Sequence, residues 1–217
     1  MRLFLLHTLL FALLSLSSCK KDHKVTKSIT FNPDHNQSEV HLFGNNTGID
    51  QSGLDVSEIE GGVGTYLGDT VFVRADFTFD LSDIPSFASV VSAKLFLYSN
   101  PTPLNGEGDK SRANSGKDNA ILISRIASSW IPSSITWLNQ PPTTESDQIV
   151  IPHTDSAFLD LEDINVTKMV TTMVKADQNY GFQIRLKTEK AYTWRIFCSS
   201  KYPNTSKHPK LVVQYTE

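Results

Sequence analysis

Several features that would assign a function directly are missing from this 217-residue chain. Acidic and basic residues nearly balance, 23 against 20, so nothing points to nucleic acid as a partner. The motifs G-x-S-x-G and H-E-x-x-H are absent, and the histidines after residue 18 show no metal-ligand spacing. Zinc is therefore not expected. A lyase or hydrolase site assembled from residues far apart in the sequence is an open alternative. Polysaccharide cleavage usually needs a longer cleft than a sandwich of this size provides, so we expect that the protein is not an enzyme.

Long apolar runs are scarce as well. Leu9 to Leu14 form a short one within residues 1–18, between an early arginine and small residues, which is the layout of a secretory signal peptide. The run is too short to span a bilayer stably. Leu16-Ser17-Ser18-Cys19 resembles a bacterial lipobox, in which the cysteine becomes the lipidated first residue, with plain secretion as the alternative. We predict a signal peptide at 1–18, a tether at 19–26, and a bacterial outer-membrane or cell-surface protein held by a lipid on Cys19, its one contact with the membrane.

Cysteine is nearly absent, with two in the whole chain. If Cys19 is acylated, Cys198 is the only thiol left, which excludes an intrachain disulfide. Cleavage leaves 217 minus 18, or 199 residues, with 19 basic and 23 acidic side chains and a net charge near −4. This length suffices for one well-buried domain, which we place at residues 27–217. Its stability must come from a hydrophobic core or from an ion.

Strand patterns dominate the predicted domain. In VFVRADFTFD, residues 71–80, Val71, Val73, Ala75, Phe77 and Phe79 alternate with mostly polar residues. SAKLFLYS, YGFQIRLK and KLVVQY repeat this pattern, and shorter candidates are SITF, EVHLF, AILISRI, AFLDL and WRIFCS. Turn-rich segments such as Gly61 to Gly64 separate them. About ten short strands without alternating helices predict an all-β fold, a jelly-roll-like antiparallel β-sandwich.

One short helix is expected at about 164–175. Its apolar residues fall at i, i+3, i+4, i+7 and i+8, and they are Val166, Met169, Val170, Met173 and Val174. Asn165 is a suitable N-cap. The apolar stripe should close one open edge of the sandwich, with both methionines as core fillers.

Several blocks of sequence occur in a characteristic order: FTFDLSDIPSFASVVSAKLFLYS, ISRIASSWIPSSITWLNQPP, INVTKMVTTMV, NYGFQIRL, FCSS and HPKLVVQY. In this order they resemble the DNRLRE-type domain, a carbohydrate-binding module family of β-sandwich proteins, from about Val71 to Tyr215. The chain departs from that pattern at Asn165, where Asp is usual, and at Ser200-Lys201, where Arg-Glu is usual. The resemblance implies a non-catalytic polysaccharide-binding protein. The alternative is a structural or adhesive surface module with no glycan site of its own.

Trp130 and Trp137 lie seven residues apart in SSWIPSSITWLNQPP. An indole serves equally as a sugar platform or as a core residue, because it joins a large apolar face to one N–H donor. Both tryptophans stand where DNRLRE-type domains characteristically carry Trp. That position favours the core over a platform.

The polar faces of the strands suggest a binding surface. If Val73, Leu95 and Ile184 point inward, five basic or aromatic residues point outward, namely Arg74, Lys94, Tyr98, Arg185 and Lys187. Arginine pairs with carboxylates, and tyrosine offers a ring to a pyranose. The surface would suit an acidic, uronate-containing polysaccharide that is alginate- or pectin-like. The alternative is that these are ordinary solvated strand faces.

A structural calcium ion is a further possibility. Asn45, Asp50 and Asp55 lie in a loop that also contains glycine, and oxygen-rich loops of this kind can hold Ca²⁺. The same residue types are common in turns, so the loop needs no ion to explain it. No other cofactor is expected.

Overall fold

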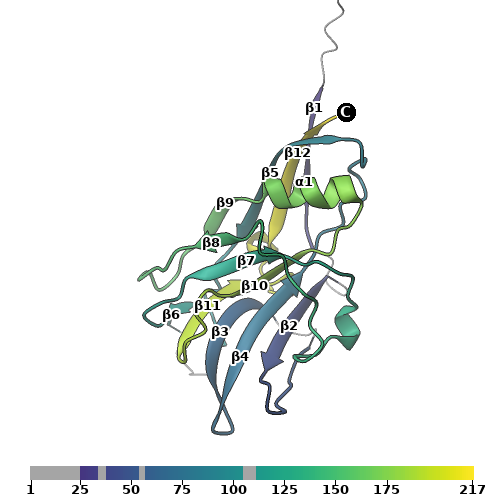
Figure 1. The fold of residues 1–217 in the computed structure, drawn as a ribbon. Coiled ribbons are helices and arrows are strands. Elements are labelled where there is room, and N and C mark those ends of the chain that lie inside the picture. Colours follow the sequence, from purple (N-terminus) through teal and green to yellow (C-terminus); the bar gives the residue numbers. More distant parts are fainter. Residues whose placement is uncertain (1–24, 34–37, 54–56, 105–110) are drawn as a thin grey trace, which may run out of the picture.

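The computed structural model describes residues 25–33, 38–53, 57–104 and 111–217 (Figure 1). In these residues, antiparallel strands form two sheets, with one α-helix beside them. The predicted all-β sandwich is confirmed. The predicted signal peptide and Cys19 lie outside the described residues. Within the described ranges, no helix has the length and apolar character needed to cross a membrane.

The smaller sheet has four strands in the order β1-β12-β5-β9. They are β1 (Thr26–Phe31), β12 (Lys210–Thr216), β5 (Ser89–Leu97) and β9 (Leu161–Asn165). Strand β5 alternates as predicted, since Ala93, Leu95 and Leu97 are fully buried while Lys94 and Phe96 are half-buried. Phe96 lies opposite Lys210 in the pairing of β5 with β12. The two side chains therefore share the outward face of this sheet.

The larger sheet has eight strands, with β4 at its centre. Its strands are β6 (Asn114–Ser115), β11 (Thr193–Cys198), β3 (Glu58–Tyr66), β4 (Asp69–Phe77), β10 (Phe182–Leu186), β7 (Ile121–Arg125), β8 (Ile149–Ile151) and β2 (Glu39–Gly44), which pairs with β4. Val71, Val73, Ala75 and Phe77 of β4 are buried, so its predicted alternation is confirmed. Two short 3-10 helices, η1 (Pro132–Ser134) and η2 (Thr205–Lys207), lie in the loops.

Strand β3 corrects the sequence prediction, because Gly61 to Gly64 lie inside this strand and not in a turn. Gly62 pairs with Val73 of β4 and with Trp194 of β11. A Cβ atom at Gly62 would lie 2.0 Å from Cε3 of Trp194, and one at Gly64 would lie 2.8 Å from Cζ2 of the same ring. These two glycines therefore make room for the Trp194 indole within the sheet.

The segment AFLDL, residues 157–161, was predicted to be a strand, and this is a second correction. The strand in this region is β9, which begins only at Leu161. Phe158 and Leu159 are 42% and 37% exposed. The chain here is a loop, and the carbonyl of Ala157 accepts the N–H groups of Ala113 and Asn114.

Helix α1 (Thr167–Ala176) begins later than the predicted start near residue 164. Asn165 belongs to β9, where it pairs with Lys94 of β5, so the sheet holds this residue in the extended conformation. Its side-chain Oδ1 still accepts the backbone N–H of Thr167 at 3.1 Å. The apolar stripe, including Met169 and Met173, is buried as predicted.

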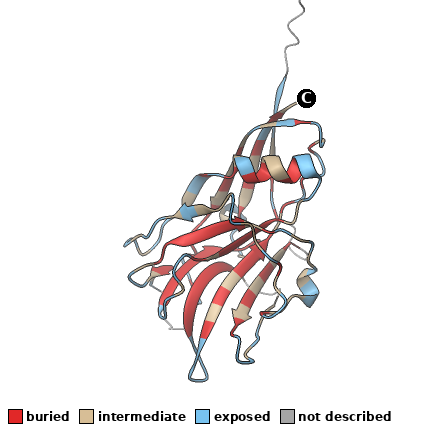
Figure 2. Ribbon diagram, viewed as in Figure 1, coloured by how far each residue is buried: buried red, intermediate tan, exposed pale blue. Residues whose placement is uncertain are grey.

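The largest hydrophobic cluster draws on both sheets and on α1. It contains Phe77 and Ile184 from the larger sheet, Leu95 and Val213 from the smaller sheet, and Met169 from the helix. Figure 2 shows buried residues along the strands of both sheets, with exposed residues mainly in loops and hairpin tips. Because the inward faces form this core, any binding surface must lie on an outward face or among the loops.

Candidate functional site

The structure divides the five predicted binding residues between the two sheets. Arg74 lies on β4 and Arg185 on β10, both in the larger sheet, and Lys187 follows β10 directly. Lys94 lies on β5 of the smaller sheet, and Tyr98 follows that strand. The sequence left open which sheet carries the binding surface, and the structure shows that the five residues do not share one sheet. Alternation within a strand gives the direction of each side chain, but it does not say which strands share a sheet.

Arg74 is already occupied by partners within the protein. Its Nε and Nη2 donate to Oε1 and Oε2 of Glu189 at 2.8 and 3.0 Å. Nη1 donates to Oε1 of Gln140 at 2.9 Å, and the guanidinium carbon lies 4.8 Å from the ring centre of Trp137. With its charge neutralised and three of its five N–H donors occupied, Arg74 holds the loop against the sheet and is a poor ligand for an anion.

Arg185 and Lys187 are less constrained. Nη1 of Arg185 donates to the neighbouring carbonyl of Leu186 at 3.1 Å, and the side chain is half-buried. Lys187 is exposed. Both remain candidates, but within the described residues neither lies over an aromatic ring.

The outward face of the smaller sheet gathers basic and aromatic side chains into what we call the lysine–aromatic surface. It consists of Lys94, Phe96, Tyr98, Lys207 and Lys210. Nζ of Lys210 lies 4.6 Å from the ring centre of Phe96 and 5.6 Å from that of Tyr98. Nζ of Lys207 lies 5.3 Å from the Tyr98 ring. Ammonium groups and rings thus alternate across one face.

Charge on the lysine–aromatic surface is only partly neutralised. Lys207 forms an ion pair with Asp160 at 2.8 Å, and the hydrogen bond to this carboxylate raises the pKa of Lys207. Nζ of Lys94 lies 3.5 Å from the backbone carbonyl of Asp163. Within the described residues, Lys210 has only its two aromatic contacts. Lys94 and Lys210 therefore have no carboxylate partner in this part of the chain.

Tyr98 departs from its predicted exposure. The sequence places it outward, but its relative exposure is 8%. Lys207 and Lys210 lie over its ring and cover it. Phe96 is the half-buried ring that stays accessible beside them.

The sequence prediction missed Phe96, Lys207 and Lys210. Alternation in SAKLFLYS places Phe96 on the same face as Lys94, which is a usable signal. Lys210 opens KLVVQY, but its position beside Phe96 follows from the pairing of β12 with β5. Lys207 sits in η2, in a segment that the sequence marks only as turn-rich.

Trp137 is a buried core residue, whereas Trp130 is only half-buried. Trp137 is 5% exposed, and its ring stacks on Phe72 with ring centres 5.8 Å apart. Its Nε1 donates to Oδ1 of Asn46 at 3.0 Å. Trp130 is half-buried, and its Nε1 donates to the carbonyl of Tyr180 at 2.8 Å. The core interpretation of the sequence is thus correct for Trp137, whereas Trp130 keeps an accessible surface.

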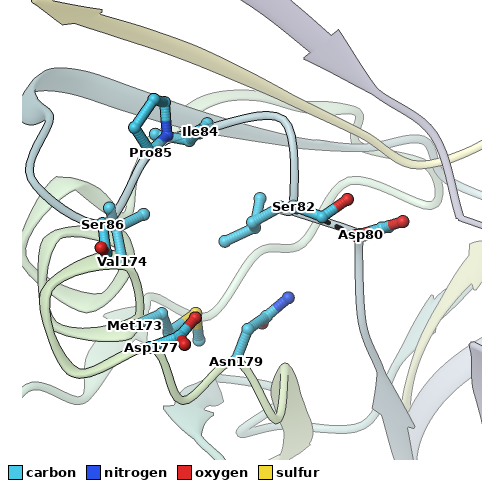
Figure 3. A pocket seen from close by; sticks show the side chains of 10 residues that line it. Asp80, Ser82, Ile84, Pro85, Ser86, Met173, Val174, Asp177 and Asn179 are labelled. Atoms are coloured by element: carbon cyan, nitrogen blue, oxygen red, sulfur yellow. Dashed lines mark hydrogen bonds between the residues drawn. The ribbon is translucent and has the colours of Figure 1, made fainter. Parts of the chain in front are cut away.

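A pocket of about 460 Å³ lies between the loop after β4 and the C-terminal end of α1 (Figure 3). Ile84, Pro85 and Met173 form apolar walls, while Asp177 and Asn179 lie at its lower rim in this view. Its lining contains carboxylates but no lysine or arginine. Two negative charges disfavour an acidic polysaccharide at this pocket.

The predicted calcium residues serve as turn residues in the structure. Oδ1 of Asn45 accepts the N–H groups of Thr47 and Ile49 at 3.0 and 3.1 Å. The carboxylate of Asp50 accepts the N–H of Ser52 through Oδ1 and that of Trp137 through Oδ2. Asp55 lies outside the described residues. Among the residues that are described, no three or more His, Cys, Asp or Glu side chains group as metal ligands. Calcium stays a prediction.

Comparison with known proteins gives one family. The model of carbohydrate-binding module family 96 matches residues 72–215. No curated protein matches the chain. The matched range begins in β4 and ends in β12, so it contains α1, the whole lysine–aromatic surface and the strands of both sheets except β1, β2 and β3. The finer resemblance to the DNRLRE type stays a prediction.

Proposed function

We propose that this chain, which belongs to carbohydrate-binding module family 96, binds an acidic, uronate-containing polysaccharide without cleaving it. The family match is the observation that carries carbohydrate binding. Families of this kind are usually non-catalytic. The acidic preference rests on the lysine–aromatic surface, where two lysines have no carboxylate partner in the described part of the chain.

The chemistry of this surface fits a polyuronate of the alginate or pectin type. Each sugar carries a carboxylate, which an ammonium group binds through a charge-assisted hydrogen bond. The apolar face of a pyranose can pack on the half-buried ring of Phe96, which lies between Lys94 on its own strand and Lys210 on the next.

The test is a titration with a polyuronate and a neutral polysaccharide, at low and high salt, using the wild type, Lys94→Ala and Lys210→Ala. Exposed charge-assisted bonds are worth about 1 kcal/mol each here, so each substitution should weaken polyuronate binding about fivefold. Screening by salt should weaken wild-type binding as well. The matched control is Lys175→Ala, an exposed helix residue that should leave affinity unchanged.

The outcomes separate the candidate functions. Salt-insensitive polyuronate binding that survives both substitutions would contradict this site. Failure to bind any polysaccharide would favour a structural or adhesive module. Loss of binding in Lys175→Ala as well would mean that net charge, and not this surface, drives association.

The same proposal includes a lipid anchor at the bacterial outer membrane or cell surface, through the predicted lipobox cysteine Cys19. Replacement by serine removes the acylated thiol, so the protein should leave the membrane fraction with its fold intact. Fractionation of cells that express Cys19→Ser tests this point. A variant that stays with the membrane would show that another segment holds the protein there.

A further inference from the structure

Trp130 stands between two hollows at the surface. One has a volume of about 380 Å³ and is formed by the loop that carries Trp130 and runs to Pro142. The other, of about 230 Å³, is bordered by Thr78 and Tyr180. Trp130 and Ser129 line both. Trp130 also packs against the buried cluster of Val40, Leu42 and Trp137, so only the accessible part of its side chain can face a ligand.

The indole is held rigidly in this position. Its N–H is committed to the carbonyl of Tyr180 at 2.8 Å. The following residues form η1 with Pro132 at its start, and the side chain of Asn139 donates to the carbonyl of Ser134 at 3.1 Å. The loop is therefore braced before any ligand arrives, which lowers the entropic cost of binding. Contact with a ligand would use the ring surface, because the N–H already has its acceptor.

Charge is absent from both hollows. Neither lining includes Asp, Glu, Lys, Arg or His. Within the described residues, the hydroxyls of Ser128, Ser129 and Tyr180 have no hydrogen-bond partner. An aromatic ring surrounded by neutral hydroxyls recognises an uncharged, hydroxyl-rich ring that also has an apolar face.

We propose that Trp130 is a stacking platform for a neutral sugar residue, at a site separate from the lysine–aromatic surface. This inference rests on the proposed polysaccharide-binding function and adds a second subsite with a different chemistry. The two sites would let one module contact both charged and uncharged sugars of a mixed polysaccharide. Binding at Trp130 does not depend on ion pairs, so it does not weaken with salt.

Intrinsic fluorescence tests this site in the unmodified protein. Trp130 is the one half-buried tryptophan of the three, since Trp137 and Trp194 are 5% and 2% exposed. Acrylamide should therefore quench mainly Trp130. Neutral gluco-, manno-, xylo- and galacto-oligosaccharides are the probes, and at least one should protect Trp130 equally at low and high salt.

Variants assign the effect by calorimetry. Trp130→Ala should weaken binding of the protecting oligosaccharide about tenfold, whereas Trp130→Phe should keep it within about threefold because a ring remains. Lys210→Ala should leave it unchanged. If Trp130→Ala does not fold, the quenching of Trp130 in the wild type and the affinity of Trp130→Phe still test the proposal.

Three results would overturn the proposal: no protection by any neutral oligosaccharide, protection that vanishes with salt, or tight binding that survives Trp130→Ala. Each is independent of the polyuronate titration, in which Lys210 and salt carry the expected effect. Failure of the polyuronate site with intact protection of Trp130 would instead leave a neutral-glycan module.

Discussion

Two contacts between a cation and an aromatic ring look alike in this molecule and differ in what surrounds them. Arg74 lies 4.8 Å from the ring centre of Trp137 on the larger sheet, and Lys210 lies 4.6 Å from that of Phe96 on the smaller sheet. Glu189 neutralises Arg74, whose side chain is 22% exposed. Lys210 has no such partner in the described residues. The first contact serves the fold, and the second is available to a ligand.

The difference shows how to read a basic residue on a strand. Alternation marks Arg74 and Lys94 as equally outward. Glu189 lies 115 positions away from Arg74 in the sequence, and it decides that Arg74 is not free. The arrangement of countercharges, and not the direction of the side chain, separates a structural cation from a binding one.

The largest expected effect is on stability, at Trp137. Trp137→Ala should lower the free energy of unfolding by about 3 to 5 kcal/mol, because it removes a buried ring that stacks on Phe72 and supports Arg74. Phe96→Ala, on the accessible side of the comparison, should cost much less stability and instead weaken polyuronate binding. Urea denaturation and titration of both variants provide the measurement. A stable Trp137→Ala variant that no longer binds polyuronate would show that Trp137 is a binding residue and not a core residue.

The fold was largely predictable because alternation records burial locally. Strands β4, β5, β10 and β12 each carry their buried apolar side chains at every second position, although Asp76 of β4 and Gln183 of β10 are buried between them. Strand β3 was missed because its glycines look like a turn until Trp194 from a distant strand is placed on them. The late start of α1 has a similar cause, since Asn165 is held by its pairing with β5.

The candidate site was only half predictable. Lys94 follows from one strand alone, whereas Lys210 and Lys207 reach Phe96 and Tyr98 only through tertiary pairing. Burial of Tyr98 depends on those same lysines. A binding surface that spans two strands and a loop is a property of strand order, which no local pattern records.

A second prediction concerns pH, on the Arg74 side of the comparison. Asp76, two residues along β4, is fully buried with one hydrogen bond from Gln183 at 2.9 Å, and burial raises its pKa from 3.8 to about 7. A raised pKa in the folded state means that the protonated form stabilises the protein. This contribution is complete below pH 3.8 and is lost as the pH rises toward 7.

The measurement is the free energy of unfolding between about pH 5 and pH 8, where the wild type should lose about 2 to 3 kcal/mol more than Asp76→Asn. Glu58, whose pKa burial also raises to about 7, titrates in both proteins, so the difference isolates Asp76. Lys210→Ala should follow the wild-type curve. Parallel curves for the wild type and Asp76→Asn would show that Asp76 is ionised in the folded protein throughout this range.

The smallest expected effect tests the comparison most directly. Glu189→Gln removes the carboxylate charge that is paired with Arg74, and it keeps a side chain of the same shape at position 189. Arg74 still has Gln140 and the Trp137 ring, and the pair is partly exposed, so the loss of stability should be about 1 kcal/mol. If Arg74 is structural, polyuronate affinity should stay within about twofold of the wild type, since the guanidinium remains held against the ring. Titration of Glu189→Gln and of the matched Arg74→Gln gives the answer. A gain in affinity of several-fold in Glu189→Gln that disappears in the double variant would mean that releasing Arg74 creates a binding cation. In that case, the only feature that makes Arg74 structural and leaves Lys210 available to a ligand would be the carboxylate of Glu189.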